Sequence, residues 1–161
     1  MAAADDELYS LLVPLREGRL LLPRSCVAEV VRYHPPQPVA RAPGWLRGLL
    51  TWNDRRIPVA SFEELLGQSP GEPGGRTRIA VIQGITGRLA AGAFGLLTEG
   101  FPQLVRVNRQ VMEPVDRHAW PDPGPVICQI RMINEHPMIP DIEGIEALIA
   151  AALEGEPEVL A

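Results

Sequence analysis

The residue types that most often carry catalysis or bind metals are scattered through this sequence. The candidate ligands and nucleophiles are His34, His118, His136, Cys26, Cys128, Ser25, Ser61 and Ser69. No histidine pairs at helical spacing with another ligand type, the cysteines lack a Cys-x-x-Cys partner, and none of these serines lies within Gly-x-Ser-x-Gly. We therefore predict no metal site, no cofactor and no catalytic nucleophile.

The acidic residues also lack the arrangement of an acid and base dyad. Asp5-Asp6 and Glu63-Glu64 are adjacent pairs, whose side chains point in different directions in a helix or a strand. The glycine-rich stretch 71–75 is not followed by the Lys and the Ser or Thr that hold phosphate and magnesium in a phosphate-binding loop. These features favour a protein that works through its surfaces rather than through titrating groups.

The charge of the chain is unevenly spread. The chain has 161 residues, a net charge of −5 and 15 basic residues, all of them arginine. Eight arginines lie between residues 16 and 56 against three acids, whereas seven acids and no arginine follow Arg131. The basic region suits an acidic partner, and a solvated arginine-rich surface explains it equally well. The overall acidity argues against general nucleic-acid binding.

Length and hydrophobicity indicate one domain that does not enter a membrane. A hydrophobic content of 46% can bury a core without disulfides. The first seven residues are acidic where a signal peptide is basic, and the longest uncharged apolar stretches, such as 89–97, are far shorter than a membrane span. We predict a cytoplasmic protein with no direct membrane insertion.

Apolar runs separated by turn residues predict strands in the first half. Residues 8–15 and 20–22 flank Gly18, which offers the left-handed conformation of many reverse turns, and they predict a hairpin. Residues 26–33 predict a strand, or a helical turn leading into one, that ends at the prolines after His34.

Residues 42–59 predict a second hairpin. Asn53 and Asp54 tolerate positive φ and suit a two-residue loop. One apolar face is predicted for Leu46, Leu49, Leu50, Ile57 and Val59. Trp45 is predicted to pack in the core, whereas Trp52, beside the tip, suits either packing or a partner contact.

The second half repeats the pattern of short strands. Further strands are predicted at residues 78–83, 89–97, 104–107 and 127–133. Ser61 and Glu64 have the spacing of a capping box before Gly67, which predicts a short helix, and Asp141 is placed to cap a closing helix that ends near Gly155. Many short strands with two or three helices indicate an all-β barrel or sandwich, and the pattern leaves that choice open.

Four segments together resemble the CheW-like chemotaxis coupling proteins. Residues 43–59 are similar to the family's Pro-x-aromatic-Leu-x-Gly-Val followed by Asn-Leu-Arg-Gly, an apolar run, Pro and Val. Residues 18–31 resemble its opening, and residues 94–100 and 138–148 resemble its later strand and its closure. The resemblance covers nearly the whole chain. It implies a mainly β fold of two small five-stranded SH3-like barrels around a shared hydrophobic core, with a short mid-chain helix and a C-terminal helix.

The resemblance also implies domain limits and a function. Residues 6–154 are expected to form a single CheW-like domain with a subdomain boundary within the 67–77 loop, and residues 1–5 and 155–161 are expected to be flexible tails. The function implied is that of a non-enzymatic adaptor that couples the cytoplasmic tip of a methyl-accepting chemoreceptor to the regulatory domain of a CheA-type histidine kinase. Such a protein is recruited to receptor arrays at the membrane.

Carried over position by position, the resemblance implies two binding surfaces. The kinase-binding residues are Val27, Ala28, Glu29 and Val31. Val27 and Val31 are expected to share one face of a strand, with Glu29 between them. The receptor-binding residues are Arg47, Thr51, Asn53, Asp54, Arg55 and Arg56.

The chain departs from the family pattern at the hairpin tip. Thr51-Trp52-Asn53-Asp54 stands where the family has Asn-Leu-Arg-Gly, so the arginine associated with receptor coupling is absent from its own position. This change suggests a divergent branch, such as the coupling proteins of type IV pilus chemosensory systems that serve twitching motility. The alternative function is a small-barrel nucleic-acid or ligand-binding module, which Arg55 and Arg56 beside Trp52 favour.

Overall fold

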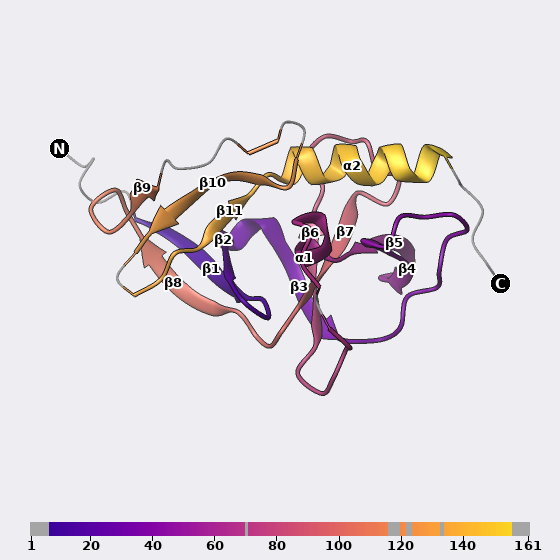
Figure 1. Ribbon diagram of the computed structural model, residues 1–161, viewed down its shortest axis with the longest axis horizontal. Coiled ribbons are helices and arrows are strands. Elements are labelled where there is room, and N and C mark those ends of the chain that lie inside the picture. Colours follow the sequence, from indigo (N-terminus) through magenta and orange to yellow (C-terminus); the bar gives the residue numbers. More distant parts are fainter. Residues whose placement is uncertain (1–6, 70, 116–119, 122–123, 133, 156–161) are drawn as a thin grey trace.

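The chain forms two β-sheets side by side, and the long helix α2 (Ile142–Gly155) lies alongside the second of them (Figure 1). The structure is a computed structural model that describes residues 7–69, 71–115, 120–121, 124–132 and 134–155. The tails predicted at 1–5 and 155–161 lie outside the described residues, apart from Gly155 at the end of α2. Asp5-Asp6 and His118 also lie outside them.

The first sheet, sheet A, has six strands in the order β8-β1-β2-β11-β10-β9. Their bounds are β1 (Leu8–Pro14), β2 (Arg19–Pro23), β8 (Gln103–Val107), β9 (Glu113–Val115), β10 (Val126–Arg131) and β11 (Met138–Pro140). β1 and β2 form the predicted first hairpin, although Gly18 in its turn does not adopt a positive φ. β9 was not predicted from the sequence, because three residues that include a proline carry no alternating pattern.

The second sheet, sheet B, has five strands in the order β3-β6-β7-β5-β4. Their bounds are β3 (Val27–Arg32), β4 (Leu46–Trp52), β5 (Arg55–Ala60), β6 (Arg78–Gln83) and β7 (Ala93–Thr98). A short 3-10 turn, η2 (Arg24–Cys26), leads into β3. This agrees with the second of the two predictions for the segment, a helical turn that leads into a strand. β7 begins at Ala93 rather than at residue 89, because residues 89–92 form a turn in which the Gly92 amide donates to the Leu89 carbonyl.

Sheet B closes into a barrel because its two edge strands are joined. The chain after β3 returns to β4, where Gln37 and Leu49 exchange two backbone hydrogen bonds of 2.8 Å each. Asn53 (φ 47°) and Asp54 (φ 60°) form the tight turn between β4 and β5, with positive φ at both central residues as their types predict. The barrel interior is fully buried and contains Ile57, Val59, Ile79, Val81 and Ala93.

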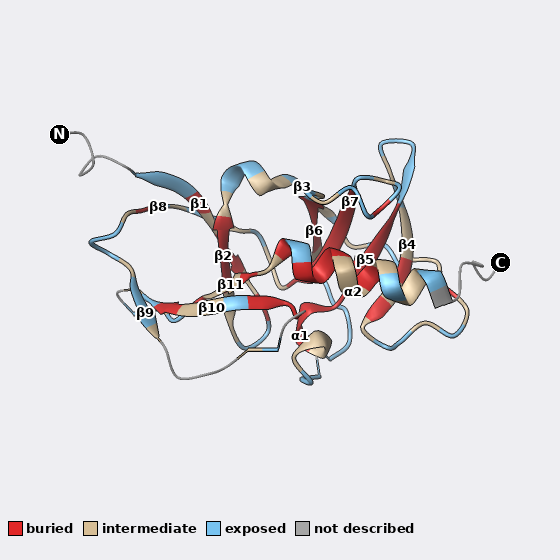
Figure 2. Ribbon diagram, turned by 90° about the horizontal axis from the view of Figure 1, so that it is seen from above, coloured by how far each residue is buried: buried red, intermediate tan, exposed pale blue. Residues whose placement is uncertain are grey.

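A shared hydrophobic core lies between the two sheets and α2, which Figure 2 shows as the buried segments in the middle of the molecule. Sheet A contributes Leu20 and Leu22, sheet B contributes Phe94, and α2 contributes Ile145. This arrangement confirms the expected mainly β fold of two small barrels around one core, although sheet A has six strands where five were expected. Trp45 packs against the same core, as predicted.

Two register shifts overturn predictions about strand faces. A shift between Val27 and Glu29 changes the alternation of β3, so Val27 packs against the shared core while Val31 packs inside the barrel of sheet B. These two valines therefore do not share a face. A shift at the start of β4 likewise places Leu46 in the shared core, whereas Leu50 packs inside the barrel. The prediction of a single apolar face for the hairpin is therefore wrong.

Both predicted helix caps are present. Ser61 Oγ accepts a 3.2 Å hydrogen bond from the Glu64 amide at the start of α1 (Phe62–Leu65), and Gly67 (φ 81°) follows the helix. Asp141 Oδ1 accepts a 3.0 Å hydrogen bond from the Gly144 amide before α2. Within the described ranges, no helix is long and apolar enough to cross a membrane.

Candidate functional site

Most residues of the predicted receptor surface gather at the tip of the β4–β5 hairpin. Five of the predicted residues are exposed at this tip: Thr51, Asn53, Asp54, Arg55 and Arg56. Arg47 is separate from them. It lies near the other end of β4, roughly 17 Å from Trp52 at the usual rise per strand residue, and it is half-buried in an ion pair with Glu64. The structure therefore brings five of the six predicted residues together.

Trp52 connects this tip to β3. Its indole Nε1 donates a 3.0 Å hydrogen bond to Glu29 Oε1, and the Arg55 guanidinium lies 4.9 Å from the centre of its ring. The rest of the indole packs against the group that contains Ile57 and Val81. Trp52 thus packs as part of the barrel, and it also places the predicted kinase surface directly beside the predicted receptor surface.

The predicted kinase surface is only partly exposed. Ala28 and Glu29 are exposed, whereas Val27 and Val31 are half-buried on opposite faces of β3. An apolar strip made by the two valines is therefore absent from this strand. What β3 offers to a partner is the exposed pair Ala28 and Glu29.

The two arginines that follow the tip hold neighbouring segments in place. Arg55 Nη1 donates a 2.8 Å hydrogen bond to the carbonyl of Ala91 in the β6–β7 loop. Arg56 donates to Oε1 of Gln37, the residue whose backbone pairs with β4. Both guanidinium groups remain exposed, so they fix the geometry around the tip and also give it positive charge.

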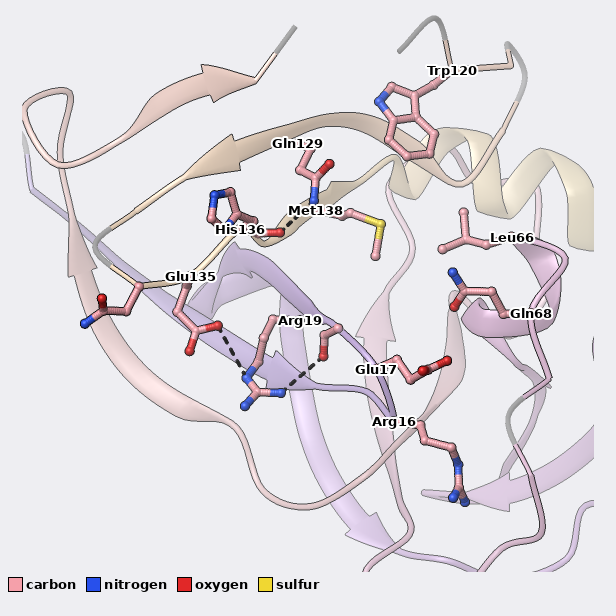
Figure 3. Close-up of a pocket in the computed structure, with 12 residues that line it drawn as sticks. Arg16, Glu17, Arg19, Leu66, Gln68, Trp120, Gln129, Glu135, His136 and Met138 are labelled. Atoms are coloured by element: carbon pink, nitrogen blue, oxygen red, sulfur yellow. Dashed lines mark hydrogen bonds and ion pairs between the residues drawn. The ribbon is translucent and has the colours of Figure 1, made fainter. Parts of the chain in front are cut away.

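An open groove of about 610 Å³ lies between the β1–β2 turn, the end of α1 and the β10–β11 turn (Figure 3). Trp120, Leu66 and Met138 supply its apolar side chains, and an ion pair of 3.8 Å joins Arg19 to Glu135 on the opposite side. Its lining includes no residue of either predicted surface. Within the described part of the chain, no group of His, Cys, Asp and Glu side chains could hold a metal ion.

Glu63 is a buried carboxylate at the junction of the two barrels. Its Oε2 accepts a 2.9 Å hydrogen bond from the backbone amide of Arg16 in the β1–β2 turn. Burial raises the pKa of Glu63, and this hydrogen bond opposes the rise. Glu99, which is itself paired with the Arg16 guanidinium at 3.1 Å, adds to the rise in the pKa.

Stability should depend on the protonation of Glu63. Because the folded-state pKa is raised, the folded chain binds the proton more tightly than the unfolded chain, so the contribution of Glu63 to stability is lost as pH rises through the folded-state pKa. Glu63→Gln keeps an oxygen for the Arg16 amide and removes the titration. We expect the variant to unfold with a smaller loss of stability between pH 4.5 and pH 7 than the wild type. Urea unfolding at several pH values measures the free energy of unfolding of both proteins. An equal fall of this free energy with pH in the two proteins would contradict the prediction.

Comparison with known proteins shows the family of this chain. A model of the CheW-like domain family matches residues 10–146. The chain belongs to the CheW-like family. A search of curated protein sequences finds no significant match. A crystal structure of the scaffolding protein TtCheW from Thermoanaerobacter tengcongensis matches with a TM-score of 0.70 and 16% sequence identity, covering 83% of this chain and 88% of that one. At this identity the likeness shows the fold.

The cysteines of this CheW-like chain are both free thiols. Cys26 and Cys128 are half-buried, and burial raises the pKa of each thiol. A raised pKa leaves less of the reactive thiolate at neutral pH. Both cysteines pack beside hydrophobic core residues, which agrees with their position in apolar runs.

The contact between Glu146 and the β6–β7 loop was not predicted from the sequence. Glu146 is fully buried in α2 and accepts hydrogen bonds from residues 85 and 86 of the β6–β7 loop. A signal was present in the sequence, because Glu146 lies four residues after Ile142 and next to Ile145, on the face of α2 that the apolar spacing predicts to be buried. A charged residue at such a position needs polar partners.

Proposed function

We propose that this CheW-like chain is a non-enzymatic adaptor of a chemotaxis-type signalling system. It couples the cytoplasmic tip of a chemoreceptor to the regulatory domain of a CheA-type histidine kinase by binding both. The family supports a scaffolding role. The observation that carries the proposal is the hydrogen bond between Glu29 and Trp52, because it places two exposed surfaces side by side on one rigid barrel. Residues 6–154 act as one unit in this proposal, as the shared core supports.

Co-sedimentation tests the proposal directly. The full chain is mixed with receptor-containing membranes and the kinase regulatory domain, each alone and together. We expect the kinase domain to sediment with the membranes only when the chain is present. A chain that sediments with neither partner would refute the adaptor function.

The kinase surface is proposed to centre on Ala28 and Glu29, with Val27 and Val31 supporting the strand from within. Ala28→Arg places a long charged side chain on the exposed part of β3 without removing the bond to Trp52. We expect about tenfold weaker binding of the kinase regulatory domain, because a bulky charge prevents close packing at an interface core. Titration calorimetry measures the affinity. Glu143→Arg, on the exposed side of α2, is the control and should bind as the wild type does.

The receptor surface is proposed to be the hairpin tip, with Thr51, Asn53, Asp54, Arg55 and Arg56, while Arg47 supports α1 through its ion pair with Glu64. Because Asp54 stands beside the place of the family's arginine, a receptor shaped for that arginine would meet a negative charge, which costs affinity.

Restoring the family's charge should restore binding to such a receptor. We expect Asn53→Arg with Asp54→Gly to bind a flagellar-type receptor tip about tenfold more tightly than the wild type does. The turn should survive, since glycine accepts the positive φ of residue 54. Surface plasmon resonance measures the affinity, and Asp54→Gly alone separates loss of the carboxylate from gain of the guanidinium. Unchanged affinity in the double variant would show that the tip is structural.

The departure at residues 51–54 supports a place in the type IV pilus branch and an output in twitching motility. A gene for a pilus response regulator or a CheA-type kinase beside the gene of this chain would support that placement. The alternative, a nucleic-acid-binding module, is less well supported because Arg55 covers the ring of Trp52 and Glu29 binds its Nε1, which leaves less of the ring for a base to stack on.

A further inference from the structure

The β6–β7 loop, residues 84–92, is held by hydrogen bonds at both ends. The Gly84 amide donates to the Gly92 carbonyl at 2.9 Å across the base of the loop, and the Gly92 amide donates to the Leu89 carbonyl at 3.0 Å. The Leu89 side chain is buried in the shared core. The loop therefore has a fixed base and an apolar anchor, although it contains three glycines.

Glu146 fixes the other side of this loop. Its Oε1 accepts hydrogen bonds from the backbone amides of Ile85 at 2.8 Å and Thr86 at 3.2 Å, and its Oε2 accepts one from Thr86 Oγ1 at 3.0 Å. Bonds to an ionised carboxylate are stronger than bonds between neutral groups. A Cβ at Gly84 would lie 2.9 Å from Glu146 Oε2, so glycine is required for α2 and the loop to approach this closely.

This rigid loop presents an isoleucine to solvent. The side chain of Ile85 is 58% exposed, although its own backbone amide is bonded to a fully buried carboxylate. Arg88 is exposed as well, and no hydrogen bond or ion pair of its guanidinium occurs among the described residues. An apolar side chain on a backbone that is already fixed loses less conformational entropy when a partner covers it than one on a mobile loop, which favours binding.

The loop lies next to the hairpin tip, because the Arg55 guanidinium bonds to the carbonyl of Ala91. The two loops together expose Arg55, Arg56 and Arg88, whereas the carboxylates of this area are those of Asp54 and of Glu29, which binds Trp52 from β3. The charge of this area is therefore positive on a chain whose net charge is −5. Charge complementarity selects an acidic partner.

We propose that the β6–β7 loop is a docking element that extends the receptor surface of the hairpin tip, with Ile85 inserting between the apolar side chains of an acidic protein surface and Arg88 pairing with one of its carboxylates. The partner is the chemoreceptor tip, so this inference rests on the proposed function. Glu146 acts as a positioning residue, which holds the loop in the binding conformation.

Two matched isoleucines test the proposal. Ile85→Asp is compared with Ile127→Asp, because Ile127 is 59% exposed on β10 of the other sheet. The full chain is titrated with a soluble fragment of the receptor tip and, separately, with the kinase regulatory domain. We expect Ile85→Asp to weaken receptor binding at least tenfold and to leave kinase binding within twofold of the wild type. Ile127→Asp should leave both within twofold.

The outcomes separate this inference from the proposed function. A wild-type chain that binds neither protein refutes both. If Ile85→Asp leaves receptor binding intact, or if Ile127→Asp weakens it equally, the docking role of the loop is overturned and the proposed function stands. A larger effect of Ile85→Asp on the kinase domain overturns the choice of partner. Retention of the wild type on single-stranded DNA, lost in Arg88→Glu, with no receptor binding, would assign the loop to nucleic acid instead.

A second variant tests the positioning role of Glu146 without removing a buried charge. Thr86→Val deletes a hydroxyl that makes two hydrogen bonds. This hydroxyl donates to Glu146 Oε2 and accepts a 3.2 Å bond from the Arg88 amide. We expect faster hydrogen exchange at the amides of residues 85–88 and a threefold to tenfold loss of receptor affinity, with kinase binding unchanged. Faster exchange with full receptor affinity would show that loop rigidity does not contribute to binding.

Discussion

Glu146→Ala is expected to lower the free energy of unfolding by about 3 kcal/mol, because it leaves three part-buried donors without their acceptor and opens a space where a fully buried side chain packs. The Ile85 and Thr86 amides lose their acceptor, and the Thr86 hydroxyl loses its partner. In a domain of this size, such a loss lowers the midpoint of thermal unfolding by roughly 6–12 °C. Calorimetry at pH 7 measures the shift.

Glu146→Gln is the matched control for this prediction. The amide oxygen of glutamine can accept from the same two backbone amides, so the loop keeps these hydrogen bonds to a side chain of nearly the same shape. We expect a free energy of unfolding within about 1 kcal/mol of the wild type. If the alanine and glutamine variants unfolded at the same temperature, the hydrogen bonds to the loop would not be the source of the stability.

The sequence predicts the main elements of this fold because they depend on local signals. Asn53 and Asp54 form the tight turn that their tolerance of positive φ predicts. The caps at Ser61 and Asp141 are equally local, because each side chain accepts from a backbone amide only three residues further along the chain. β6 was predicted to the residue, since its apolar run is bounded by clear turn residues.

The face that each strand residue occupies could not be predicted in the same way. A register shift depends on the partner strand, so the bulge in β3 that separates Val27 from Val31 has no local signature. The same limit applies to the candidate site. The chemistry of Glu29 and Trp52 is visible in the sequence, but their contact joins residues 23 positions apart at opposite edges of a closed sheet.

Arg47 illustrates how the contacts of a position carried over from a family depend on the tertiary structure of the chain at hand. It was predicted to face the receptor with the hairpin tip, and the structure places it beside Glu64 of α1. The alternation of β4 also shifts next to it, between Leu46 and Gly48, so its surroundings depend on tertiary packing. The Glu64 carboxylate is thus bound by Arg47. The Ser61 amide, which a capping box would pair with Glu64, donates to the Trp45 carbonyl instead.

Gly48→Ala should lower the free energy of unfolding more than any other single methyl group added to sheet B. Gly48 has φ 140°, and a Cβ there would lie 2.2 Å from the carbonyl oxygen of Gln37, which is backbone and cannot rotate away. Gln37 must then leave Leu49, with which it exchanges two hydrogen bonds. Backbone strain and the two lost bonds together suggest a loss of about 3–5 kcal/mol in the free energy of unfolding.

The effect of Gly48→Ala should extend to the receptor surface, because Gln37 also accepts from Arg56 through its side chain. Loss of the contact between Gln37 and β4 releases that arginine, so receptor affinity should fall together with stability. Gly74→Ala is the control, since a Cβ at Gly74 meets no atom within 4 Å and the residue does not have a positive φ. Urea unfolding and receptor titration measure the two quantities. A Gly48→Ala protein that unfolds at the same urea concentration as Gly74→Ala would show that the return of residue 37 to β4 does not close the barrel.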